Sequence, residues 1–69
     1  MKKLVSMSPR KLKAARAAMK MSQIETALAS GVSSNTVVRI EKGGYKTTKT
    51  KAEALAKALE VSVDSLLES

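Results

Sequence analysis

The sequence predicts a single all-α domain built from five short helices. The chain has 69 residues and is rich in alanine, leucine and lysine, with one proline, three glycines and a single aromatic residue, Tyr45. This composition favours helices over strands. Residues that cap helices recur along the chain at short intervals. Without cysteine or histidine, neither a disulfide nor the usual zinc site can reinforce so small a core, so stability must come from helix packing.

The first seven residues lack an apolar period, and we expect residues 1–7 to be a flexible basic arm that precedes a domain over 8–69. Ser8 and Pro9 predict a helix start, because serine can cap a helix and proline suits the first helical position. This helix should run to about Met19. Its apolar side consists of Leu12, Ala15 and Met19.

A second helix should begin at Ser22, which lies three residues before Glu25 and so predicts a capping box. It should end before Gly31, whose missing Cβ permits a left-handed turn. Either Ser33 or Ser34 then caps a third helix.

The third helix should run to about Lys42, where Gly43 and Gly44 stop it, with Val37 and Ile40 pointing inward.

Two further helices are expected near the C-terminus. Thr50 and Glu53 predict a second capping box and a helix over 51–60. Ser62 should cap a last short helix over 63–68. The inward residues of these two helices are Leu55, Ala58, Leu59, Leu66 and Leu67.

The charge is unevenly distributed. The net charge is +7, residues 1–20 hold seven basic side chains without an acid, and residues 42–51 hold four more, whereas the last ten residues hold only acids. This asymmetry predicts a basic face for a polyanion such as nucleic acid. The alternative is a solvated surface that keeps a small protein soluble.

Other classes of protein fit poorly. No apolar run approaches the roughly 18 residues of a membrane span, and the N-terminus is a poor signal peptide, so we expect a cytoplasmic protein. A cationic membrane-surface peptide is disfavoured by the many capping signals. We expect no enzyme, metal or cofactor, because histidine and cysteine are absent and no phosphate-cradling glycine motif is present.

Two short helices joined by a tight glycine turn at residues 31–33 form the pattern of a helix-turn-helix, whose second helix enters the major groove of DNA. The residues that carry a closer match are Arg16, Gln23, Ala27, Gly31, Val32, Ser33, Val37, Ile40, Glu41, Gly43 and the segment 58–67. Over about residues 9–68 the chain closely resembles the phage-repressor and Cro-like family, also called the xenobiotic-response-element type. The resemblance implies a compact five-helix lambda-repressor-like DNA-binding domain, encoded by a bacterium or a phage.

The resemblance implies that the outward side of the third helix reads bases. Asn35 can bond adenine, Arg39 can bond guanine or a phosphate, and Val38 can touch a thymine methyl. Ser34 reads DNA, caps the helix, or does both, and Arg39 is otherwise a solvated charge. Gln23 would bond a phosphate or brace the third helix. The expected reading set is Gln23, Ser34, Asn35, Thr36, Val38 and Arg39.

The following stretch, KGGYKTTKTK at residues 42–51, suits phosphate oxygens through its lysines, threonines and backbone N–H groups. The expected phosphate-contacting set is Lys42, Tyr45, Lys46, Thr47 and Lys49. A further basic set either touches DNA or stays in solvent: Lys2, Lys3, Arg10, Lys11 and Lys13.

The family also places an ion pair at the positions of Arg16 and Glu41, which would lock the first helix to the end of the third. Removing one partner of such a pair usually costs about 3–5 kcal/mol. The alternative is two unrelated solvated charges.

The chain departs from the family pattern in its second helix. The family usually has large apolar residues where Thr26 and Ser30 stand, whereas the apolar residues here include Ile24 and Leu28. Either this helix is rotated, or Ile24 and Leu28 are exposed and form a partner surface.

The leading functional hypothesis is a sequence-specific transcriptional regulator, expected to be a repressor. It should bind double-stranded operator DNA as a homodimer, with half-sites about one helical turn apart. Dimerisation or another protein contact would use Leu66 and Leu67, or Ile24 and Leu28. The alternative is a protein-interaction module of the same fold, either an antitoxin that binds a toxin as well as DNA or a bridging factor that uses the fold chiefly to join proteins.

Overall fold

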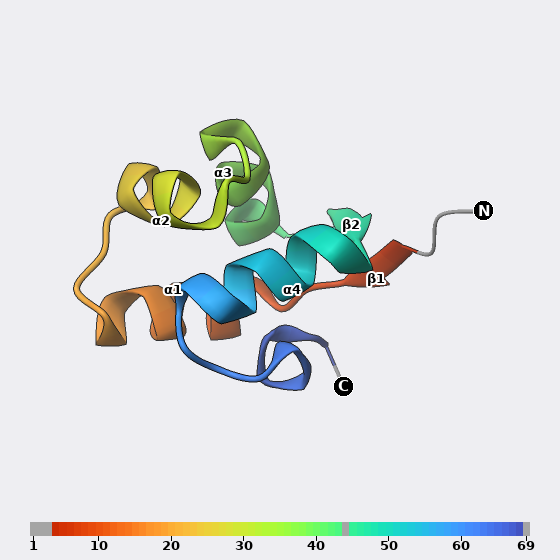
Figure 1. The fold of residues 1–69 in the computed structure, drawn as a ribbon. Helices are drawn as coiled ribbons and strands as arrows, with labels where there is room; N and C mark the ends of the chain where they lie inside the picture. The colour runs from red at the N-terminus through yellow and green to blue at the C-terminus, as the bar shows by residue number, and fades with distance from the viewer. Residues whose placement is uncertain (1–3, 44, 69) are drawn as a thin grey trace.

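The computed structural model describes residues 4–43 and 45–68, which form a small, mainly helical domain with one two-stranded sheet (Figure 1). In chain order the elements are β1 (Leu4–Ser6), α1 (Pro9–Ala18), α2 (Gln23–Ser30), α3 (Ser34–Lys42), β2 (Lys46–Thr48), α4 (Lys49–Ala58) and the 3-10 helix η1 (Val63–Leu66). Five α-helices were expected. Within the described residues there are four, together with the 3-10 helix η1 and the two-stranded sheet.

The starts of the first three helices confirm the expected caps. Ser8 accepts a hydrogen bond from the Lys11 amide at 3.3 Å before α1. At α2, Ser22 and Glu25 form the reciprocal capping box, with bonds of 2.8 and 3.0 Å. Of the two serines considered for α3, Ser33 is the cap. Each cap satisfies a backbone donor that the helix itself leaves unpaired.

The start of α4 was predicted two residues too late. Thr48 is the N-cap and accepts a hydrogen bond from the Lys51 amide at 3.3 Å, so the expected capping box of Thr50 and Glu53 does not form. Thr48 also lies opposite Leu4 in the sheet. The end of β2 therefore fixes the extended backbone that an N-cap requires.

The last predicted helix is shorter and tighter than expected. Ser62 caps it as predicted, accepting from the Ser65 amide at 3.3 Å. The following residues turn away because they pair with the N-terminal segment: Leu67 lies opposite Met7, and the Glu68 amide donates to the Ser6 carbonyl at 2.9 Å. These contacts replace the last turn of the helix.

The expected flexible arm is wrong for residues 4–7. Leu4–Ser6 form β1, which pairs antiparallel with β2, and Met7 is buried in the core. The strand was hard to predict because its three residues gain hydrogen-bond partners only from distant parts of the chain, namely β2, some 40 residues away, and Glu68. Lys2 and Lys3 lie outside the described residues.

The core sits where the helices converge. α3 packs against α2 and α1, while α4 packs against α2 and η1. The largest fully buried side chains are Leu12, Val37, Ile40, Leu55, Leu59 and Leu66. Leu66 was expected at a protein contact, but it is 0% exposed and belongs to this core.

Helix α2 has the orientation that the resemblance implies, with the Thr26 side chain facing the core. Thr26 is fully buried, with its hydroxyl 3.9 Å from the Met21 sulfur, whereas Ile24 and Leu28 are 64% and 79% exposed. Ser30 is half-buried. The sequence left two alternatives, a rotated helix or exposed Ile24 and Leu28, and the second is correct.

Among the described residues, no helix is both long and apolar enough to cross a membrane.

Candidate nucleic-acid interface

The turn between α2 and α3 is built from short local contacts. Gly31 adopts a left-handed conformation with φ of 74°, which glycine tolerates because it lacks Cβ, and its amide donates to the Ala27 carbonyl at 2.9 Å. Ser30 accepts a hydrogen bond from the Val32 amide at 3.2 Å. Val32 is buried and Ser33 caps α3. The angle between the two helices is therefore fixed by both backbone and core contacts.

Helix α3 has a buried side and a solvent-facing side. Val37 and Ile40 are completely buried, as the sequence predicted, and they hold the helix against α1 and α2. Ser34, Asn35 and Arg39 are exposed, while Val38 is half-buried. The exposed residues offer hydroxyl, amide and guanidinium groups, which are the groups that bond base edges in the major groove.

Thr36 does not belong to the solvent-facing side of α3. It is 8% exposed, and its hydroxyl lies 2.9 Å from the Ser33 hydroxyl. The Ser33 oxygen also accepts from the Thr36 amide at 3.2 Å. The expectation that Thr36 lies on the solvent-facing side of α3 is therefore wrong, because its side chain contacts the helix cap.

Three exposed lysines of the expected phosphate-contacting set lie between the end of α3 and the start of α4: Lys42, Lys46 and Lys49. Tyr45 is half-buried and packs against the core. Thr47, expected in the phosphate-contacting set, is 3% exposed because its side chain points inward from β2. The expectation that the Thr47 side chain faces solvent beside the lysines is therefore wrong.

Side chains from α1 and α2 hold the end of α3 through Glu41. The Arg16 guanidinium donates to both carboxylate oxygens of Glu41, at 2.8 and 3.0 Å, and to the Met21 carbonyl at 2.9 Å. Gln23 donates to Glu41 at 3.2 Å, so this side chain braces α3, one of its two expected roles. The hydrogen bond to Glu41, aided by its charge, raises the pKa of Arg16 above its usual value despite partial burial. Two parallel bonds fix direction as well as distance.

The helix-turn-helix family model matches residues 12–66, which includes the whole turn and both flanking helices. The chain belongs to the HTH_3 helix-turn-helix family.

Two solved structures resemble this helix-turn-helix protein over most of its length. The restriction-modification controller protein C.AhdI from Aeromonas hydrophila is 27% identical, with a TM-score of 0.79 over 86% of this chain and 89% of that one. An HTH_3 family transcriptional regulator from Vibrio cholerae is 30% identical, with a TM-score of 0.78 over 87% of this chain but 34% of that one. The search of curated proteins yields no significant match. Together, the family and these neighbours support a DNA-binding transcriptional regulator.

The remaining basic residues of this helix-turn-helix protein are dispersed. Arg10 and Lys13 are exposed on α1. The Lys11 ammonium instead donates to the Leu67 carbonyl at 3.0 Å, which ties α1 to the C-terminal segment. Within the described residues, neither the Arg10 nor the Lys13 side chain forms a hydrogen bond or an ion pair with α3.

Sequence reasoning missed two features of the interface. Because α4 begins at Lys49, both Lys49 and Lys51 lie in its first turn and are exposed. The second feature is β1, which pairs directly with β2, the strand that carries Lys46. The available signal for a strand followed by a cap was the threonine pair between two lysines at residues 46–49, but this signal is only four residues long.

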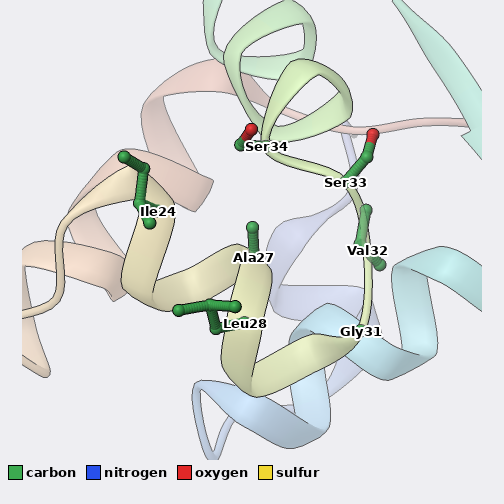
Figure 2. A pocket seen from close by; sticks show the side chains of 7 residues that line it. All are labelled: Ile24, Ala27, Leu28, Gly31, Val32, Ser33 and Ser34. Carbon is green, nitrogen blue, oxygen red and sulfur yellow. The ribbon is translucent and has the colours of Figure 1, made fainter.

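The α2–α3 corner also carries an open apolar pocket of about 400 Å³. Figure 2 shows Ile24 and Leu28 along one side of α2, with Val32 and Ser33 across the turn. Within the part of the chain that the structure describes, no group of three or more acidic side chains could hold a metal ion.

Proposed function

We propose that this chain is a sequence-specific DNA-binding repressor that reads the major groove with α3. The observation that carries the proposal is the solvent-facing side of α3, where Asn35 and Arg39 stand free of the chain's own core. An amide and a guanidinium on one exposed helix face match adenine and guanine edges. The buried side of the helix, its cap and the Arg16–Glu41 pair hold that face in a fixed orientation.

The charges that follow α3 support phosphate contacts beside the groove. Lys42 ends α3, Lys46 stands on β2 and Lys49 opens α4, and all three are exposed. Lysines and free helix N-terminal amides position a protein on the duplex without reading its sequence. The net charge of +7 adds a general attraction that falls with salt.

A homodimer on a roughly palindromic operator is the proposed active form. A single α3 spans too few base pairs for a unique site, and two-fold helix-turn-helix dimers place their half-sites about one helical turn apart. The similarity to a controller protein and to a transcriptional regulator is consistent with control of transcription.

The test is selection of bound sites from a random duplex pool, with the molar mass of the complex measured by light scattering. The proposal expects an enriched palindrome and two chains per duplex. Enrichment of a single half-site that is bound by one chain would contradict the proposed homodimer. Absence of any enrichment, with binding that depends only on salt, would remove sequence-specific recognition.

A second candidate is a protein-interaction module such as an antitoxin or a bridging factor. It is favoured by Ile24 and Leu28, which are largely exposed beside an apolar pocket. Large exposed apolar pairs often mark protein contacts. The same selection experiment separates a bridging factor from the first candidate, because a module that joins proteins without reading DNA leaves the pool unenriched.

A further inference from the structure

The N-terminal segment lies between the C-terminal residues and Lys46–Thr48, the part of the expected phosphate-contacting set that forms β2 and is called the loop below. On one edge, Leu4–Ser6 pair with Lys46–Thr48. On the other edge, the Ser8 amide donates to the Leu66 carbonyl at 2.8 Å and the Glu68 amide donates to the Ser6 carbonyl at 2.9 Å. Figure 1 shows β1 and β2 side by side at the start of α4. The loop therefore pairs with β1, and the N-terminal segment that contains β1 is itself hydrogen-bonded to the C-terminal residues.

The pairing pattern shows which residue of β1 holds the loop. The amide and carbonyl of successive strand residues point to opposite edges. Because the Ser6 carbonyl faces Glu68, the backbone groups of Val5 face β2, where Val5 lies opposite Thr47. The backbone of Leu4 faces away from β2. Val5 is thus the residue of β1 whose N–H and C=O are placed to bond Thr47.

This pairing sets the direction in which the loop lysine points. In an extended strand, neighbouring side chains point to opposite faces. Thr47 is buried and Lys46 is exposed, as that alternation requires. Just before the loop, Pro9 lies beside Gly43, because a Cβ built on Gly43 would stand at an ordinary van der Waals distance of 3.6 Å from Pro9 Cγ. The segment from Leu4 to Pro9 therefore flanks the loop at both ends.

We propose that Val5 is a positioning residue for DNA binding: through its pairing with Thr47, β1 holds the loop so that Lys46 and the first turn of α4 meet the phosphate backbone. This inference rests on the proposed function and names a part of the site that lies outside the helix-turn-helix itself. Base readout by α3 does not depend on it. Loss of β1 should weaken binding to all duplexes alike.

The test compares Val5→Pro with Leu4→Pro in the full chain, using a selected duplex and an unrelated duplex at several salt concentrations. Proline removes the backbone N–H in both variants, but only Val5 directs that group toward β2. We expect Val5→Pro to reduce affinity for both duplexes about tenfold and to lower the salt slope by about one to two, since each lost phosphate contact removes about 0.9. Leu4→Pro should match the original chain.

Hydrogen exchange separates positioning from general unfolding. In Val5→Pro the Thr47 amide should exchange faster, while amides in the middle of α3 keep their protection. Should Val5→Pro unfold the whole chain, Val5→Gly and Leu4→Gly form a milder matched pair for the same measurements.

The outcomes distinguish the two proposals. If the original chain showed no salt-dependent binding and no preference for the selected duplex, the proposed function itself would be overturned. An original chain that binds as proposed, together with a folded Val5 variant of unchanged affinity and salt slope, would overturn the role of β1 alone.

Discussion

Arg16 and Glu41 are 25 residues apart in the sequence, yet their side chains meet through two hydrogen bonds of 2.8 and 3.0 Å. The pair joins α1 to the end of α3, and both side chains are largely shielded from water, with 16% and 8% exposure. Gln23 at the start of α2 donates to the same carboxylate. One acidic side chain thus connects three helices around the α2–α3 corner.

Arg16→Ala should destabilise the fold by about 3 kcal/mol, because it leaves the Glu41 carboxylate shielded without its cationic partner. Denaturant unfolding followed by circular dichroism measures this. Arg10→Ala is the matched control on the same helix: Arg10 is exposed, so its loss should stay within about 0.5 kcal/mol. Equal stability of the two variants would contradict a structural role for the pair.

The contribution of Arg16 should not vary with pH near neutrality. Its pKa is raised in the folded chain, chiefly by the hydrogen bond to Glu41. A raised pKa contributes stability that is complete at every pH below the ordinary value of arginine and is lost only as pH rises through the raised one. The stability difference between the original chain and Arg16→Ala should therefore be constant from about pH 6 to 9. A slope attributable to Arg16 in that range would be inconsistent with this.

Asn35→Ala and Arg39→Ala should each relax the base preference at one position of the site, at a cost of about 1–3 kcal/mol. Both side chains are exposed on α3, so the fold should keep its melting temperature. Site selection with each variant shows which base pair loses its preference. If the double variant selected the same sequence as the original chain, α3 would not be the reading helix.

Lys46→Ala should weaken binding to every duplex and reduce the salt slope by about one. Lys46 is exposed on β2, whereas the neighbouring Thr47 is buried. Lys57→Ala provides the control, since Lys57 is exposed near the other end of α4. A titration series in salt distinguishes the two lysines, and equal slopes for both variants would deny Lys46 a phosphate contact.

Thr26→Val should stabilise the chain by about 1 kcal/mol. The Thr26 side chain is fully buried, and its hydroxyl has a weak acceptor in the Met21 sulfur at 3.9 Å. Replacing the hydroxyl by a methyl group of similar size removes a poorly compensated polar atom from the core. Thermal unfolding measures the gain. A lower melting temperature would show that the hydroxyl is better satisfied than its contacts indicate.

The sequence was most informative where structure is encoded locally. The caps at Ser8, Ser22 and Ser62 and the turn at Gly31 each depend on residues within about four positions, and all four were predicted correctly. The pattern also indicated the partners Arg16 and Glu41, but only through resemblance to the family.

The features that sequence could not supply depend on distant segments. β1 acquires its partner from β2 and its second edge from Glu68, and nothing within Leu4–Ser6 signals either. The shift of α4 to Lys49 follows from the same pairing, because Thr48 ends the strand and caps the helix at once. The buried side chains of Thr36 and Thr47 were assigned to DNA from residue type, which does not reveal the direction of a side chain.

The two apolar surfaces suggested for protein contact should respond in opposite ways to substitution. Leu66→Ala should cost about 2–5 kcal/mol, since Leu66 is 0% exposed and its loss leaves a cavity. Leu28→Ala should stay within about 0.5 kcal/mol, because Leu28 is 79% exposed. Unfolding measurements on both variants test this. A dimer formed through Leu66 would require the core to open, so of the two suggested surfaces the side of α2 that carries Ile24 and Leu28 is the more accessible one. Leu28→Glu should then reduce self-association in light scattering without lowering the melting temperature. If Leu28→Glu kept two chains per operator, the dimer would have to form through another part of the chain.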